Sequence, residues 1–207
     1  MSKWLLLWLL PGVVPGLAET RELPSASPIA LYTRFQRPAS TRIVEAMQDE
    51  LETIMAPLGL DFSWRELDPQ RGGEVVAELA VVTFRGQCTT DGLMATEGTS
   101  GALGWTHISD GAILPFSEVD CDRIRTFLQK ALLAVPAAER ELVFGRAVAR
   151  VLAHELYHIF ANTTHHASCG IAKSGFTVRE LLDQEFQFEE RELRSFQQNR
   201  PRRAITP

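Results

Sequence analysis

The stretch "HELYHIFANTTHH", residues 154–166, contains four of the five histidines of the chain and a glutamate beside the first of them. On a helix, side chains four residues apart stand one above the other, so the imidazoles of His154 and His158 can both reach one metal ion. Histidine is sparse in proteins, and this His-Glu-x-x-His pattern is typical of zinc sites. The spacing therefore predicts a zinc site on a long helix.

The residues before the motif predict that this helix is buried. Two apolar stripes lead into the motif at helical spacing: Val143, Ala147 and Val151, and Phe144, Val148 and Leu152. The second stripe leads to Glu155, whose carboxylate would be partly desolvated, which raises its pKa and suits a general base. Zinc held by three protein groups keeps a fourth position for water and lowers the pKa of that water. The pattern thus predicts hydrolysis of a peptide bond with Glu155 as the base.

The third zinc ligand must come from the chain after the helix. Asn162, Thr163 and Thr164 are poor helix formers, and they favour a turn that brings the chain back to the metal. The next two residues are both histidines, His165 and His166. Neighbouring side chains in an extended segment point to opposite sides, so we expect only one of the two to coordinate.

The composition is that of a globular protein, and its charges produce no positive electrostatic field that would attract a polyanion. It has 207 residues, a formal charge of -5 and a sequence pI near 5.6, and the only basic run is the short "RPRR" at residues 200–203. Nucleic acid is therefore an unexpected partner. We expect one domain over residues 28–200 and a tail over 201–207, and the sequence gives no oligomeric state.

The first residues predict export. Residues 1–18 have a positive start at Lys3, an apolar run from Trp4 to Leu10 and a small-residue cleavage site ending at Ala18, as in a signal peptide. Residues 19–27 would form a flexible lead-in. The mature protein would be secreted or periplasmic, with no membrane-spanning segment, since the apolar run is too short to span a bilayer.

Export changes the interpretation of the three cysteines, because an oxidising compartment permits disulfides. Cys88 and Cys121 flank a loop-and-strand segment, and we predict that they pair. Cys169 is then left as a free or packed thiol rather than a metal ligand.

The order of the predicted elements gives an α+β fold. Residues rich in β-branched and aromatic side chains predict strands, and apolar residues at helical spacing predict helices. The predicted strands cover residues 29–35, 60–67, 74–84, 103–109 and 112–119, and the predicted helices cover 40–56, 122–134, 137–161 and 177–197. Thr177 and Glu180 have the spacing of a capping box, and Pro115 favours an edge strand.

Two further residues are candidates for the cleft. His107 lies in the predicted strand 103–109, where a lone histidine is more often structural. Tyr157 would bind an oxyanion only if it pointed towards the metal, but its position predicts another face of the helix. We therefore assign neither residue to the site.

These motifs resemble those of the zincin metallopeptidases, and the third histidine after a loop is similar to the metzincin branch. The resemblance implies a zincin-like fold, in which a small mixed sheet packs on an N-terminal helix and a long active-site helix, with a C-terminal helix after them. It also implies His154 and His158 as zinc ligands, Glu155 as the base, and a peptide or protein substrate. Glu180 or Glu185 as third ligand would instead resemble the gluzincins.

The chain departs from the metzincin pattern at three points. Ala161 stands in place of a glycine, the third histidine comes eleven or twelve residues after His154 instead of ten, and no methionine follows Met94. The stretch "HASCGIAK", residues 166–173, resembles a form in small secreted bacterial proteins in which the third histidine precedes a Gly-Ile-Met turn. Ala172 would take the place of that methionine. On this resemblance we choose His166 as the third ligand, with His165 as the alternate.

Two functions of different kinds follow from the sequence. The first is a secreted zinc metallopeptidase with Glu155 as general base. The second is a secreted binding or scaffold domain that zinc stabilises without turnover, which the missing glycine and methionine favour. A secreted domain without metal is a third, weaker hypothesis.

Overall fold

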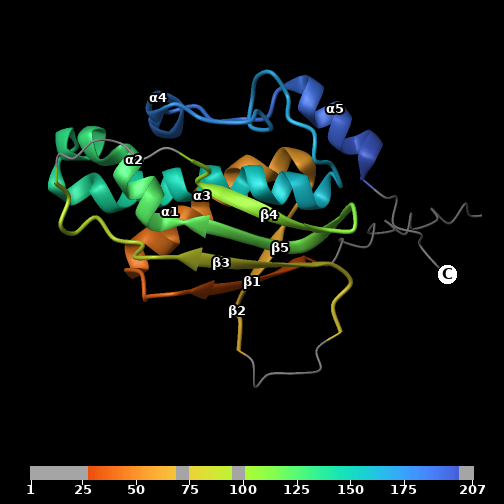
Figure 1. Cartoon of the computed structure of the whole chain (residues 1–207), viewed down its shortest axis with the longest axis horizontal. Helices are drawn as coiled ribbons and strands as arrows, with labels where there is room; N and C mark the ends of the chain where they lie inside the picture. Colours follow the sequence, from red (N-terminus) through yellow and green to blue (C-terminus); the bar gives the residue numbers. More distant parts are fainter. Residues whose placement is uncertain (1–27, 69–74, 95–100, 201–207) are drawn as a thin grey trace, which may run out of the picture.

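The computed structural model describes residues 28–68, 75–94 and 101–200. The predicted signal peptide, lead-in and tail lie outside this part of the chain. Within it, five strands form one mixed sheet in the order β2-β1-β3-β5-β4 (Figure 1). The strands are β1 (Ile29–Phe35), β2 (Phe62–Glu66), β3 (Leu79–Arg85), β4 (Gly104–Ser109) and β5 (Ala112–Asp120). β4 is antiparallel to β5 at one edge, and the other strand pairs are parallel.

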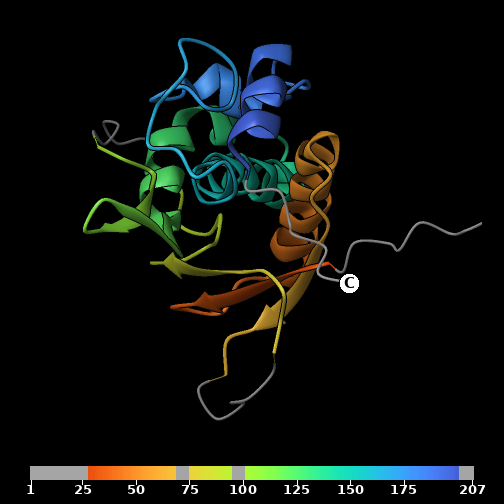
Figure 2. The same ribbon diagram turned by 90° about the vertical axis from the view of Figure 1, so that its right-hand side faces the viewer.

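Three helices cover one face of this sheet: α1 (Thr41–Met55), α2 (Cys121–Ala134) and α3 (Arg140–Phe160) (Figures 1 and 2). Ser40 caps α1 by accepting a hydrogen bond from the backbone N–H of Ile43, as the predicted helix start requires. α1 and α3 approach closely at Gly145, where a Cβ atom would meet the carbonyl oxygen of Ile43 at 2.6 Å. Buried Arg150 on α3 also binds Glu50 on α1, with 2.7 Å between Nε and Oε1.

Helix α3 is the middle layer of the structure. The sheet lies on one side of it, and α4 (Val178–Leu182) and α5 (Glu190–Asn199) lie on the other (Figures 1 and 2). Because α3 is covered on both sides, nearly every residue from Phe144 to Phe160 is buried. The α+β fold and its long buried helix are confirmed, including the two apolar stripes apart from half-buried Val143. Short 3-10 turns at Ala56–Leu58 and Ala137–Glu139 occupy two ends that were predicted as helix.

The predicted C-terminal helix over residues 177–197 is wrong in its middle. The capping box of Thr177 and Glu180 is present, but α4 ends at Leu182 and α5 begins at Glu190. Between them, Phe186 packs over the guanidinium group of Arg150, and Phe188 packs against Tyr157 with 5.5 Å between ring centroids. These tertiary contacts override the helical propensity of the segment.

Two details of the predicted strands are also wrong. β3 begins at Leu79, which pairs with Ala30 of β1, and residues 75–78 are not part of it, while residue 74, where the predicted strand begins, lies outside the described residues. Pro115 lies on β5, which is an inner strand of the sheet. The register of β5 with β3 begins only at Phe116, so no ladder with β3 requires an N–H group from this proline.

No helix in the described parts of the chain has the length and apolar character needed to cross a bilayer.

A disulfide joins Cys88, in the segment after β3, to Cys121, the first residue of α2. The predicted pairing is therefore confirmed in the structure. Cys169 is a free, half-buried thiol, as expected.

Replacing both Cys88 and Cys121 by alanine should lower the free energy of unfolding by roughly 2 to 4 kcal/mol, because the bond closes a loop of 33 residues in the unfolded chain. Urea denaturation of oxidised wild type and of the double variant measures this difference. A Cys169→Ala variant is the matched control and should keep the wild-type midpoint. Equal midpoints for all three proteins would contradict the stabilising role.

Candidate metal and catalytic site

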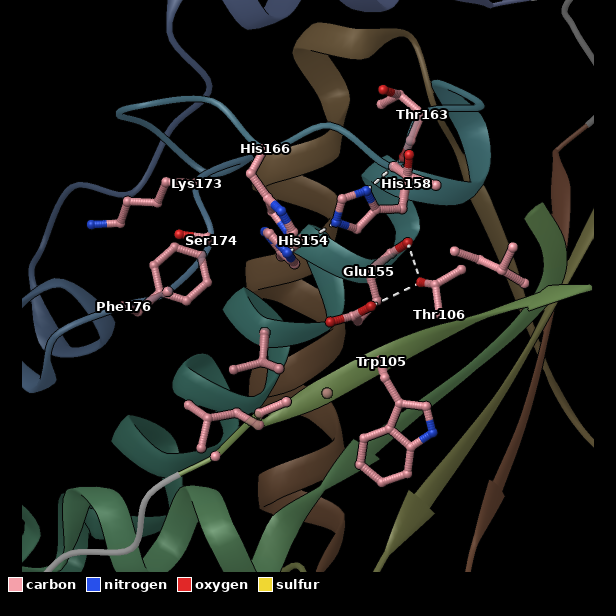
Figure 3. A pocket seen from close by; sticks show the side chains of 18 of the residues that line it. Trp105, Thr106, His154, Glu155, His158, Thr163, His166, Lys173, Ser174 and Phe176 are labelled. Carbon is pink, nitrogen blue, oxygen red and sulfur yellow. Dashed lines mark hydrogen bonds between the residues drawn. The ribbon is translucent and has the colours of Figure 1, made fainter. Parts of the chain in front are cut away.

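The last two turns of α3 form one wall of a cavity of about 480 Å³. His154, Glu155 and His158 line it from the helix, β4 lines the opposite side, and the segment of residues 163–176 closes it from above (Figure 3). The stripe pattern of the sequence buries α3 against the sheet, and this burial carries the polar residues at the end of the helix into the cavity. The predicted helix residues of the site are therefore brought together.

The chain returns to the cavity through a left-handed residue. Asn162 has φ +47°, and the N–H of Thr163 donates to the carbonyl of His158 at 3.2 Å, which ends the helix. Asparagine tolerates this conformation better than most residues. Ala161 keeps a helical backbone, with φ −84°, so the position where the resemblance expects glycine does not need one.

The returning segment places His166 against the two helix histidines. Its ring stacks on that of His154 with 5.3 Å between centroids and meets that of His158 edge-on at 4.9 Å. One ring nitrogen from each of the three histidines lies within 4.8 Å of the others, and these three are the group in the described chain that could hold a metal ion. His165 is exposed and outside this group, and its N–H donates to the hydroxyl of Thr163 at 3.1 Å.

Two backbone carbonyls fix the helix histidines in the tautomer that binds a metal. Nδ1–H of His154 donates to the carbonyl of Ile171, and Nδ1–H of His158 donates to that of Thr163, both at 2.7 Å. Each neutral ring then carries its lone pair on Nε2. The two Nε2 atoms are 3.1 Å apart, so their lone pairs face and repel each other. A cation bound by both nitrogens would remove this repulsion.

This donor set fits zinc. Zinc–nitrogen bonds of about 2.0–2.1 Å in a tetrahedron separate two nitrogens by roughly 3.3–3.4 Å, close to the distance found here. Burial lowers the pKa of His154 to about 4, against the opposing effect of the Ile171 carbonyl, and burial also lowers the pKa of His158. Both rings are therefore neutral at pH 7, as metal binding requires.

Glu155 faces the cavity beside the histidines, and no cationic group of the described residues pairs with it. It is 5% exposed, and burial raises its pKa to about 7, while a hydrogen bond from Thr106 lowers it. The hydroxyl of Thr106 on β4 donates to Oε2 of Glu155 at 2.8 Å and also lies 3.0 Å from the hydroxyl of Ser117 (Figure 3). A buried carboxyl group with a pKa near neutrality can both accept and donate a proton.

Thr106 is a site residue that sequence reasoning missed. Strand alternation puts Thr106 on the opposite face of β4 from Trp105 and His107. This alternation was the signal by which the sequence could have predicted Thr106 as a site residue. β4 reaches the helix because Gly104 has no side chain, and a Cβ atom there would lie 3.1 Å from Cγ of Glu155. The apolar part of the cavity was missed as well, and it includes Leu103, Trp105, Ile108, Ile113, Phe127, Val151 and Phe176.

The other candidates lie outside the ligand group. His107 is exposed and pairs with Glu118, with 3.2 Å between Nε2 and Oε1. Tyr157 packs away from the cavity against Phe188. Glu180 forms an ion pair with Lys173, and the thiol of Cys169 donates to Glu189 at 3.1 Å.

Glu185, the remaining carboxylate considered as a third ligand, is exposed on the segment between α4 and α5. It does not belong to the ligand group of the described chain.

Comparison with solved structures relates this arrangement to known folds. An archaemetzincin from Methanopyrus kandleri superposes with a TM-score of 0.50 at 15% identity, over 86% of this chain and 98% of that one. The fold is therefore zincin-like. A zinc-dependent peptidase from Methanocorpusculum labreanum matches with a TM-score of 0.49 at 14% identity, over 81% and 99% of the two chains. No protein-family model matches the sequence, and no curated protein matches it.

Burial of Glu155 predicts a pH dependence of stability in the metal-free protein. Because the folded pKa is raised from 4.5 to about 7, the folded state holds a proton that the unfolded state has lost, so stability falls as pH rises from about 4.5 to 7. Glu155→Gln stays neutral and should therefore gain roughly 2 to 3 kcal/mol relative to wild type across this window.

Denaturation of both proteins in the presence of a chelator, at several pH values, measures this gain. Glu190→Gln is the matched control, since it makes the same carboxyl-to-amide change at a position that is 83% exposed on α5. A pH-independent difference for Glu155→Gln would show that burial does not hold this carboxyl group protonated.

Proposed function

We propose that this protein is a zinc-dependent peptidase. One observation carries the proposal: three histidine nitrogens converge on one point of a cavity whose wall also presents a buried glutamate with its pKa raised to about 7. A site that only stabilises the fold needs neither an open cavity nor an unpaired acid beside the ligands. The zincin-like fold agrees with this function, although fold by itself does not establish one.

His154, His158 and His166 would hold the zinc ion. Bound zinc supplies a Lewis acid that polarises a carbonyl group and lowers the pKa of a water molecule. Zinc with three protein ligands leaves a position for substrate, unlike the closed four-ligand sites that stabilise folds. The carbonyls of Ile171 and Thr163 hold the two helix imidazoles with Nε2 towards the cavity.

Glu155 would move the proton in the reaction. Its carboxylate accepts a proton from the attacking water and then gives it to the amine of the departing peptide. Thr106 donates to Oε2 and so holds one oxygen of the carboxylate, leaving Oε1 for the proton. The low-dielectric surroundings keep the pKa near neutrality, so that the same group serves as base and then as acid.

The cavity also indicates the kind of substrate. Its apolar wall, formed by residues such as Leu103, Phe127 and Val151, would take an aliphatic or aromatic side chain next to the cleaved bond. We propose that the protein works after export, secreted or in a periplasm, and the disulfide between Cys88 and Cys121 supports this location.

Two measurements separate this function from a zinc-stabilised scaffold. Elemental analysis of the purified protein tests for bound zinc, and digestion of a broad peptide library followed by mass spectrometry tests for cleavage. A peptidase would cut next to apolar residues and would stop when a chelator removes the metal. Zinc without any cleavage would support the scaffold, and absence of zinc would exclude both.

Glu155→Gln should keep zinc bound and lose peptidase activity by about a hundredfold or more, since the ligands remain while the base is lost. Metal content and turnover of a library-derived peptide are measured on the same sample. Glu118→Gln, on β5 outside the cavity, is a carboxyl-to-amide control that should retain activity. Unchanged turnover in Glu155→Gln would exclude the proposed mechanism.

His166→Ala should lose most of its zinc affinity, because it removes one of three ligands. His165→Ala, at the adjacent exposed position, is the matched control and should change affinity only modestly. Competition with a chromophoric chelator gives both dissociation constants. The reverse order of effects would assign the third ligand to His165.

A further inference from the structure

A buried carboxylate far along the chain contacts the peptide group that orients His154. The carbonyl oxygen of the peptide unit between Ile171 and Ala172 accepts the Nδ1–H bond of His154 at 2.7 Å. The N–H of that same peptide unit donates to Oε1 of Glu192 at 2.5 Å. The peptide group therefore stands between a carboxylate on α5 and a histidine on α3.

Backbone N–H groups surround the carboxyl group of Glu192. The side chain is 3% exposed, and its other oxygen, Oε2, accepts the N–H of Glu189 at 2.6 Å. Burial raises the pKa of Glu192 above its usual value, hydrogen bonds from the backbone of Ala172, Glu189 and Ile171 oppose this shift, and the nearby charge of Glu189 adds to it. These contacts are all made by N–H donors, and a carboxylate accepts each of them. Glu192 also lies in the first turn of α5, where the helix dipole favours an anion.

The turn is shaped to admit this carboxylate. Gly170 has φ +77°, and a Cβ atom there would overlap the carboxylate of Glu192. Glycine at this position therefore meets two requirements, a left-handed backbone and space for an acid that follows 22 residues later. The backbone of Ala167 and Ala172 closes the same turn with a hydrogen bond of 2.9 Å.

An anion on the N–H side of a peptide group makes its carbonyl oxygen a stronger acceptor, because hydrogen bonds in a chain polarise one another. A stronger acceptor at Nδ1–H makes Nε2 a better donor to a metal, as carboxylates do when they contact a ligating histidine directly. We propose that Glu192 is a positioning residue of the metal site, which orients and polarises His154 through the Ile171–Ala172 peptide. The charge thus acts across one peptide group instead of by contact.

His158 provides an internal comparison. Its Nδ1–H also donates to a backbone carbonyl at 2.7 Å, that of Thr163. Within the described residues, no carboxylate hydrogen-bonds to the N–H of the peptide that follows Thr163. The two helix histidines therefore have matched carbonyl partners, and only the partner of His154 is backed by an anion.

The effect on the metal rests on the zinc site proposed above, but the contact itself can be tested without metal. In the metal-free full-length protein, NMR should detect a coupling across the hydrogen bond between the Ala172 amide nitrogen and the Glu192 carboxyl carbon. The Nδ1 proton of His154 should also resonate further downfield than that of His158. Absence of the coupling at an assigned Ala172 amide would overturn the proposal, whatever any variant does.

Glu192→Gln should raise the zinc dissociation constant about 10- to 100-fold, measured by chelator competition, as for other groups that orient zinc ligands. The His154 Nδ1 proton should move upfield while that of His158 stays in place, a change that a purely structural role would not produce. Glu190→Gln is the control, because it removes a charge from the same helix turn at an exposed position.

The outcomes of this experiment are distinguishable. Wild-type protein that binds no zinc would exclude the proposed function, while the NMR arm would still decide the contact. Zinc-binding wild type with a Glu192→Gln variant of equal affinity and unchanged His154 resonance would overturn the role of Glu192. If Glu192→Gln does not fold, the coupling in the wild-type protein decides.

Discussion

The hydrogen bonds from His154 and His158 to two backbone carbonyls are the contacts on which the metal site depends. A neutral imidazole has one N–H and one lone pair, so the acceptor chosen for Nδ1–H decides which way the metal-binding nitrogen faces. Both acceptors, the carbonyls of Thr163 and Ile171, belong to the segment that follows α3. The site therefore requires that the chain leave the helix and return over its end. Asn162 provides the turn, and the contact of Glu192 with the Ile171–Ala172 peptide holds the far end of the segment.

The burial that orients these groups also opposes the stability of the metal-free protein. The Nε2 atoms of His154 and His158 lie 3.1 Å apart, and Glu155 is buried with no cationic partner among the described residues. Such strain persists only where the rest of the fold over-determines it. Here α3 lies between the sheet and the C-terminal helices, and the buried ion pair of Arg150 and Glu50 joins it to α1. Binding of a cation would relieve the repulsion, which couples metal affinity to folding.

The departures from the metzincin pattern have a common explanation in the backbone. Asn162 has the left-handed backbone and Ala161 a helical one, so the helix continues through Ala161 before the chain turns back. This agrees with a third histidine that comes later than in the family pattern. Where that pattern has a methionine, Ala172 is 2% exposed, and the contacts of the turn are made by its peptide group. A backbone contact places few demands on the side chain, and alanine can therefore occupy the position.

The sequence by itself determined the features that depend on neighbouring residues. The helix starts at Ser40 and Thr177, the strand at residues 29–35 and the four-residue spacing of His154 and His158 are local features, because capping, strand propensity and helical period act within a few residues. The disulfide pairing was also predicted, because Cys88 and Cys121 flank a loop-and-strand segment.

Only the tertiary structure decided the rest. The sequence left His165 and His166 as alternatives, and it showed neither the contact of Thr106 with Glu155 nor that of Glu192 with the turn. The last two contacts join residues 49 and 20 positions apart. The break in the last predicted helix likewise comes from the contacts of Phe186 and Phe188 with α3. Such contacts depend on how layers pack, and the energy of packing around α3 exceeds the small propensity differences that a single sequence reveals.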